Sequence, residues 1–201
     1  MGKIFVLMGK SATGKDTIFK ALQQDPELSL KTVVSYTTRP IREGEENGRE
    51  YYFVTNERWE EMKRQNLIIE SRTYHTVHGD WHYFTANDGQ IVPDASDYLL
   101  ISTLEGFRGL CRFFGKETVV PLYIEVEDGI RLQRALDREK QQKKPKYEEM
   151  CRRFLADAAD FSEEKRKEAG IDAFFRNDDL NVCRQEIVKA MKGFCTPAGA
   201  K

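Results

Sequence analysis

Short apolar runs alternate with amphipathic segments along the 201 residues of the chain. Apolar runs rich in branched and aromatic residues predict buried strands, whereas apolar residues three and four apart predict helices. The predicted strands cover residues 4–8, 30–36, 67–70, 98–102, 118–125 and 171–175, and the predicted helices cover 15–24, 56–65, 128–139, 147–168 and 180–191, with one more opening at 103. This alternation predicts an α/β fold with a parallel sheet and helices on both faces.

The first predicted strand leads into a turn that contains two glycines. Gly9 and Gly14 permit backbone conformations closed to other residues, so successive N–H groups can point at one anion. Lys15 follows where a helix begins, and the positive end of that helix also attracts an anion. The spacing Gly-x4-Gly-Lys is the core of a triphosphate-binding loop. The predicted ATP-binding residues here are Gly9, Lys10, Ser11, Ala12, Thr13, Gly14, Lys15, Asp16 and Thr17.

The residue after Lys15 departs from the usual pattern of such loops. Asp16 stands where a serine or threonine would normally hold Mg²⁺, and Thr17 follows it. We expect Thr17 to bind a phosphate and Mg²⁺ to be held largely through water, with Thr17 or Asp16 orienting that water. Alternatively, Asp16 only favours the helix N-terminus electrostatically. The alternative for the whole segment is a strand-to-helix turn that binds nothing.

Composition narrows the class of protein. The formal net charge of −1 argues against a general nucleic-acid binder, which needs a basic excess. The opening apolar run is too short for a membrane span and lacks a signal-peptide pattern. The cysteines are too widely spaced for a metal knuckle and predict ordinary thiols in a reducing compartment. We therefore expect a single cytoplasmic domain without nucleic-acid or membrane partners. The cysteines are Cys111, Cys151, Cys183 and Cys195.

A second segment, residues 35–54, is rich in phosphate-directed donors. It contains hydroxyl side chains and two arginines three apart, Arg39 and Arg42, and Gly44 and Gly48 allow the loop between them to turn. Guanidinium and hydroxyl groups suit a second phosphate. The alternative is a solvated polar loop.

The two motifs in this order resemble those of guanylate kinases. The matches are the phosphate loop, Ser-x-Thr-Thr-Arg at 35–39, Gly-Glu-x-x-Gly at 44–48 and Tyr-x-Phe-Val at 51–54. The resemblance covers essentially the whole chain and is strongest over residues 4–54. It implies a P-loop kinase with three parts: a parallel-sheet core of about 1–34, 86–127 and 156–195, a subdomain of about 35–85 that binds the nucleoside monophosphate, and a helical lid of about 128–155.

The resemblance also implies the reaction, transfer of the γ-phosphoryl group of Mg·ATP to GMP or dGMP by a monomer or homodimer. Glu70 matches the residue that reads the base, since a carboxylate can accept hydrogen bonds from guanine N1–H and the 2-amino group. A plain charge at the end of a strand is the alternative for Glu70. The implied GMP-binding residues are Ser35, Arg39, Arg42, Tyr51, Glu70, Tyr83, Thr85 and Thr103.

Two departures from the family concern the base site. The family usually has Asp-x-Asp-x-x-Gly, and its acids fall on Ile101 and Thr103 here. One of these acids ordinarily helps to read guanine and the other lies near the metal, while Thr103 can still accept one hydrogen bond. The departures leave open a related kinase that acts on another nucleoside monophosphate or phosphorylated metabolite. A guanylate-kinase-like interaction domain without catalysis is a further alternative, although such modules tend to lose the phosphate loop.

Arginines on the helices after residue 128 resemble the lid that closes over the transferred phosphate. Arg131, Arg134 and Arg138 share one helical face, for which a solvated basic surface is the plain alternative. The implied catalytic residues are Lys15, Arg39, Arg134, Arg138 and Arg153. Asn177 matches a stretch near the adenine of ATP, and a helix N-cap is its alternative role.

The three histidines lie close together in the sequence. Alternation along a strand puts His75 and His78 on opposite faces, which argues against a metal site shared with His82. We therefore expect no histidine metal site.

Overall fold

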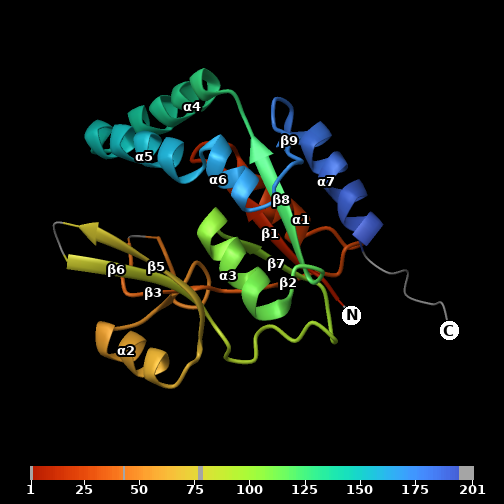
Figure 1. The fold of residues 1–201 in the computed structure, drawn as a ribbon. Coiled ribbons are helices and arrows are strands. Elements are labelled where there is room, and N and C mark those ends of the chain that lie inside the picture. The colour runs from red at the N-terminus through yellow and green to blue at the C-terminus, as the bar shows by residue number, and fades with distance from the viewer. Residues whose placement is uncertain (1, 43, 77–78, 195–201) are drawn as a thin grey trace.

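A computed structural model describes residues 2–42, 44–76 and 79–194 (Figure 1). Its larger sheet has five parallel strands in the order β2-β7-β1-β8-β9. Three strands are central and two short ones form the edges. Their bounds are β1 Ile4–Met8, β2 Lys31–Thr32, β7 Tyr98–Ile101, β8 Val119–Glu125 and β9 Phe175–Arg176. The parallel core sheet predicted from the sequence is confirmed.

Helices cover both faces of this core sheet, as expected. Phe5 and Leu7 pack with α1 (Lys15–Gln23) and α7 (Leu180–Phe194), whereas Val6 and Met8 pack with α3 (Leu104–Phe114). Alternate side chains of a strand point to opposite faces, so a strand buried on both faces must be apolar throughout. β1 is completely buried for this reason and delivers the loop after Met8 to the carboxyl edge of the sheet.

A second sheet lies beside the core and has the order β4-β3-β6-β5 (Figure 1). Its longest strands form an antiparallel hairpin. One face is apolar, because Trp59 and Met62 of α2 pack there against Phe84. The opposite face carries polar side chains. The bounds are β3 Tyr36–Thr37, β4 Tyr52–Phe53, α2 Asn56–Arg64, β5 Ile68–Thr76 and β6 Gly79–Ala86.

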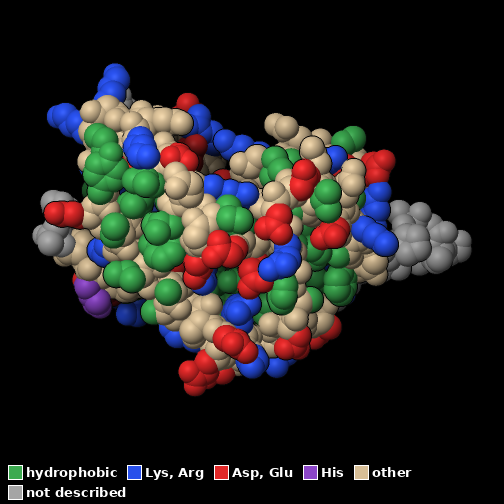
Figure 2. Space-filling model, turned by 90° about the horizontal axis from the view of Figure 1, so that it is seen from above, with side chains coloured by type: hydrophobic (Ala, Val, Ile, Leu, Met, Phe, Trp, Pro, Cys, Tyr) green, Lys and Arg blue, Asp and Glu red, His purple; other side chains and the backbone are tan. Residues whose placement is uncertain are grey.

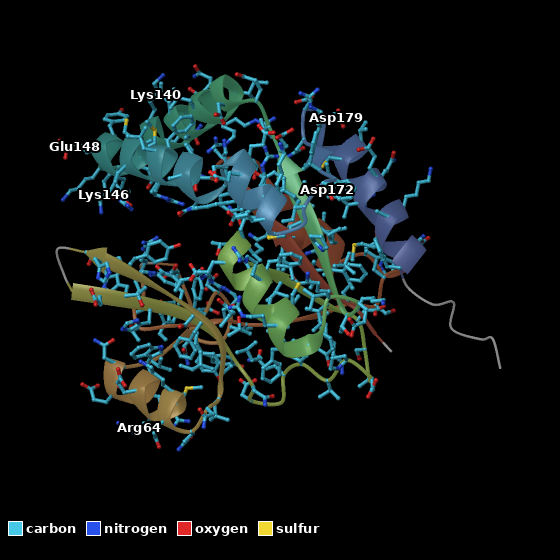
Figure 3. All side chains as sticks on the ribbon, in the orientation of Figure 1. Arg64, Lys140, Lys146, Glu148, Asp172 and Asp179 are labelled. Atoms are coloured by element: carbon cyan, nitrogen blue, oxygen red, sulfur yellow. The ribbon has the colours of Figure 1, made fainter. Side chains whose placement is uncertain are left out.

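Two further helices project from the core on the same side as the β5–β6 hairpin (Figure 1). They are α4 (Asp128–Lys140) and α5 (Tyr147–Asp160), and Lys140 and Lys146 mark the ends that the connecting turn joins (Figure 3). Acidic and basic side chains are intermixed over the face drawn in Figure 2. Within the described ranges, we find no helix with the length and apolar character needed to cross a bilayer.

The strand predicted over residues 30–36 is wrong as a single element. Residues 31–32 form β2 of the core sheet, whereas 36–37 form β3 of the second sheet. Between them the Val34 N–H donates to the Gln90 side chain at 3.0 Å instead of to a strand. This side-chain partner lets the chain pass from one sheet to the other.

The predicted helix over 147–168 is interrupted. Phe161 is buried in the core, and Ser162 then caps α6 (Glu163–Glu168) by accepting from the Lys165 N–H. Only residue 175 of the strand predicted over 171–175 pairs, in β9. Similarly, the N-cap of α2 is Thr55 and not the predicted Asn56. In each case the fold of the segment is as expected and its boundary has moved.

Candidate active site

The loop between β1 and α1 has the backbone that the two glycines predict. Gly14 has φ +81°, and Ala12 is also left-handed at +62°. A side chain at Gly9 would place Cβ 2.7 Å from the Ile124 carbonyl oxygen, and one at Gly14 would meet the Asn177 side chain at 2.5 Å. Both positions therefore exclude any residue larger than glycine, and the loop is free to curl its N–H groups inward.

The loop is fastened to α4 and α5 through Ser11. Its backbone N–H donates to Asp157 Oδ2 at 2.7 Å, and its carbonyl accepts from Arg131 Nε at 3.0 Å. Arg131 is only 1% exposed and also donates to Asp157 at 3.2 Å. Sequence reasoning assigned Arg131 only to a basic helical face and did not single out Asp157. A charged pair that holds the phosphate loop is thus an addition from the structure.

Lys15 lies half-buried at the start of α1. Burial is the main cause that lowers the pKa of its ammonium from the usual 10.5, and the carboxylates of Asp16 and Asp157 oppose that shift. The charges of Arg153 and Arg138 lower the pKa further. Arg138 and Arg153 are therefore each close enough to Lys15 to repel its charge, and a bound polyphosphate would relieve this repulsion.

Arg134 and Asn177 have structural partners. Arg134 donates to the backbone carbonyl of Asn177 at 3.2 Å, and the buried Asn177 amide donates to the carbonyl of Thr13 at 2.7 Å. Asn177 does not cap a helix, because Asp179 accepts from the first N–H groups of α7. The predicted contact between Asn177 and adenine stays a prediction, with one of the two amide hydrogens already donated inside the protein.

The second sheet presents Arg39 on its polar face. Arg39 is 3% exposed and donates to both carboxylate oxygens of Glu45 at 2.9 Å. Its Nε donates to the Tyr83 hydroxyl at 3.1 Å, and the guanidinium lies over the rings of Tyr51 and Phe53. The hydrogen bonds from Arg39 hold the pKa of the Glu45 carboxyl below its usual range. The guanidinium is thereby fixed in one orientation, and its partner Glu45 is a residue to which sequence reasoning gave no role.

The remaining phosphate-directed residues surround Arg39 less tightly. Ser35 is half-buried at the start of β3, and Arg42 is exposed, with its backbone N–H donating to Glu45 at 2.8 Å. Burial raises the pKa of Tyr51, and the charge of Asp16 contributes to that rise. Asp16 belongs to the first turn of α1, so its charge acts on Tyr51, the residue before β4.

A buried carboxylate lies at the far end of the same polar face. Glu70 accepts from the Thr85 hydroxyl at 2.7 Å and packs against α3, since a Cβ at Gly109 would lie 2.4 Å from the Glu70 Cβ. Thr103, the N-cap of α3, receives hydrogen bonds from the Gly106 N–H at 3.3 Å and from Arg72 at 2.9 Å. Arg72 was not among the predicted site residues. The expectation that Thr103 can accept from the base conflicts with this geometry, because both of its acceptor positions are used.

The described histidines have other partners. His75 bonds to Asp80 at 2.7 Å, and His82 stacks on Trp59 with ring centroids 3.7 Å apart. His78 lies outside the described residues. Among residues 2–42, 44–76 and 79–194, no group of three or more His, Cys, Asp or Glu side chains is placed to hold a metal ion.

Comparison with known proteins adds evidence independent of this geometry. The guanylate kinase family model matches residues 1–91. The guanylate kinase of Porphyromonas gingivalis is 27% identical over 207 residues, which cover 96% of this chain and 98% of that protein. The guanylate kinase of a Nostoc species is 34% identical over 137 residues, which cover 65% of this chain and 66% of that protein.

A solved structure gives the same result for the fold. The crystal structure of guanylate kinase from Anaplasma phagocytophilum superposes with a TM-score of 0.64 at 23% identity, covering 96% of this chain and 85% of that chain. At this identity the likeness concerns the fold, and the sequence matches concern the family. The chain is therefore a relative of the guanylate kinases, similar to them over nearly its whole length and sharing their fold.

Proposed function

We propose that this protein is a guanylate kinase that transfers the γ-phosphoryl group of ATP to GMP or dGMP, giving ADP and GDP. The observation that carries the proposal is that cationic side chains occur at both proposed phosphate-binding segments. Lys15, Arg138 and Arg153 gather at the phosphate loop, and the oriented Arg39 lies on the second sheet. The named relatives of the chain support the same activity.

Separate sets of residues bind the triphosphate of ATP and the phosphate of GMP. Backbone N–H groups of residues 9–17 and the Lys15 ammonium bind the triphosphate, while Ser35, Arg39, Arg42 and Tyr51 hold the phosphate of GMP. The accepting oxygen is already anionic at neutral pH, so no general base is needed. Catalysis comes from in-line positioning of the two phosphates and from neutralisation of their charge by Lys15, Arg138 and Arg153. Arg134 holds the backbone of Asn177, the residue predicted near adenine.

The residues at the start of α1 fit a magnesium ion. Asp16 and Thr17 are exposed beside Lys15 and offer a carboxylate and a hydroxyl oxygen. Mg²⁺ prefers oxygen ligands and keeps several waters when it binds through one or two protein groups and phosphates. When bound, the ion supplies further charge neutralisation of the triphosphate.

The proposal also divides the chain into three parts. We propose a core of about 1–34, 86–127 and 156–195 for ATP, a subdomain of about 35–85 for GMP, and a lid of about 128–155. Glu70, with Thr85 beside it, forms the base end of the GMP site, and Tyr83, beside Arg39, belongs to the phosphate end. We also propose that the protein acts in the cytoplasm, in keeping with the free thiols of Cys111, Cys151 and Cys183.

The test is ADP production by the purified protein with Mg·ATP and each of GMP, dGMP, AMP, CMP and UMP. We expect strong preference for GMP and dGMP. Activity on a different acceptor would be consistent with the fold and the proposed mechanism and would show that GMP is not the substrate. No activity on any acceptor, together with no thermal stabilisation by ATP, would overturn the proposal in favour of an interaction domain.

A further inference from the structure

Three buried polar atoms near α3 have no hydrogen-bond partner within the described part of the chain. They are Glu70 Oε2, Arg72 Nε and Ser102 Oγ. The Glu70 side chain is 3% exposed and that of Arg72 is 13% exposed. Buried polar atoms are normally paired, because an unpaired one keeps the full cost of its lost hydration. A group of three in one place indicates a binding site for a polar ligand.

The three atoms share one small region. Glu70 and Arg72 are two residues apart on β5 and so point to the same face of the second sheet. Arg72 Nε lies 3.6 Å from Glu70 Oε2, close enough for an ion pair and too far for a hydrogen bond. A Cβ at Gly106 would lie 2.1 Å from Ser102 Oγ and 3.0 Å from Glu70 Oε2, so both oxygens border the glycine.

The Arg72 guanidinium is held in place by α3. Its Nη1 donates to the Thr103 hydroxyl at 2.9 Å, and Thr103 is the N-cap of that helix. The Arg72 guanidinium thereby lies beside the Glu70 carboxylate as an ion pair. The site therefore presents a fixed donor next to a fixed acceptor.

This pair is complementary to one kind of purine edge. A 6-oxopurine has the O6 acceptor next to the N1–H donor, which match the Arg72 guanidinium and the Glu70 carboxylate. Adenine has a donor at position 6 and an acceptor at N1, so it would set donor against donor and acceptor against acceptor. Such a mismatch leaves buried groups unpaired and is a strong source of discrimination.

We propose that Arg72 is a specificity-determining residue that binds the 6-oxo group of the purine monophosphate while Glu70 binds N1–H. The inference rests on the proposed function and deepens it. Position 101 is an isoleucine, and the Thr103 hydroxyl already accepts from Arg72 and Gly106, so neither residue binds the 2-amino group. Inosine monophosphate, which lacks that amino group, is therefore a substrate alongside GMP.

The experiment measures kcat/KM for GMP, IMP and AMP in the wild-type protein, Arg72→Met and Arg72→Lys. We expect wild-type values for GMP and IMP within about 100-fold of each other, since IMP can lose at most the hydrogen bond from the 2-amino group to the Glu70 carboxylate, which is worth up to about that factor. Arg72→Met should lower kcat/KM for both oxopurines by about 10- to 100-fold, leave the low value for AMP unchanged, and be partly rescued by Arg72→Lys. Arg64→Met, on the exposed end of α2 in Figure 3, is the matched control and should change nothing.

Two kinetic results would overturn the inference. One is unchanged use of GMP and IMP by Arg72→Met with a normal melting temperature. The other is an equal loss for GMP, IMP and AMP, which would place Arg72 on the shared phosphate.

Equilibrium binding of GMP, IMP and AMP without ATP separates the inference from the proposed function. If the wild type binds GMP and IMP more tightly than Arg72→Met does but turns over neither, the proposed kinase activity is refuted and the proposed base site stands. Turnover of GMP with IMP discriminated by more than about 1,000-fold, beyond what one hydrogen bond provides, would keep the kinase and refute the base site.

Discussion

The two sheets of the protein solve different problems. The core sheet buries both faces in apolar side chains and sets the backbone of the loop after β1, whose N–H groups we propose bind the triphosphate. The second sheet packs one face under α2, and its other face carries Arg39, Glu70 and Arg72, which we propose bind the acceptor. The comparison teaches that the proposed triphosphate site combines a fixed backbone with the Lys15 side chain, whereas the proposed acceptor site is built from side chains alone.

The largest effect is expected on the core side. Lys15→Ala should lower kcat by about 1,000-fold, because it removes a preorganised positive charge from the transferred phosphate. The measurement is steady-state ADP release with GMP. Lys20→Ala, on the exposed side of the same helix, is the control and should keep wild-type kcat. Near-normal turnover by Lys15→Ala would remove this residue from the mechanism.

Packing under each sheet provides the next test. Leu99→Ala and Met62→Ala each remove a buried side chain and should lower the free energy of unfolding by about 2–5 kcal/mol. Only Met62 lies under the second sheet, so only Met62→Ala should raise KM for GMP more than KM for ATP. Chemical denaturation and substrate titrations check both parts. An equal change in both KM values would mean that the two sheets do not act separately.

Glu45→Gln probes the orientation of Arg39. Loss of the charged bidentate partner should raise KM for GMP by about tenfold, the worth of one charge-assisted hydrogen bond. Because Arg39 lowers the pKa of Glu45, the folded state binds fewer protons there than the unfolded state below the usual value of 4.5. This contribution to stability is present above that pH and is lost as pH falls through the lowered pKa.

Acid unfolding curves should therefore be less steep for Glu45→Gln than for the wild type. Glu46→Gln, at an exposed position, is the control. If both variants gave the same acid transition, the Arg39–Glu45 pair would not contribute to stability.

The smallest effect concerns pH on the core side. The lowered pKa of Lys15 means that its ammonium loses a proton below pH 10.5 in the nucleotide-free protein. Between that lowered pKa and 10.5 the unfolded state binds more protons, so the stability from this group rises with pH while ATP affinity falls. Thermal shift with and without ATP across alkaline pH checks the two opposite slopes. Parallel slopes would mean that Lys15 does not bind the triphosphate.

Much of the fold and part of the site follow from local sequence. The phosphate loop could be predicted because Gly9 and Gly14 occupy positions where the backbone requires glycine. The strand β1 could be predicted because burial on both faces makes it continuously apolar. Arg39 could be predicted as a site residue because its neighbours in the same short segment can also donate hydrogen bonds to a phosphate.

The rest depends on segments that only the fold brings together. Ser11 and Asp157 are 146 residues apart, and Arg72 meets Thr103 across 31 residues, so no local pattern indicates either contact. The passage from β2 to β3 was missed for the same reason. The segment predicted as one strand at 30–36 passes through a change of sheet that depends on the distant Gln90.

The Ser11 backbone has a single hydrogen to donate, and Asp157 of α5 receives it. A phosphate oxygen that takes this hydrogen must displace the carboxylate and with it loosen α5 from the loop. In the proposed kinase, triphosphate binding at the Ser11 N–H and the Ser11–Asp157 hydrogen bond are therefore linked equilibria, and a change that strengthens this hydrogen bond weakens the affinity for the triphosphate by the same free energy. The Asp157 carboxylate thus competes with the triphosphate for the Ser11 N–H. Because both groups belong to one chain, its effective concentration is constant.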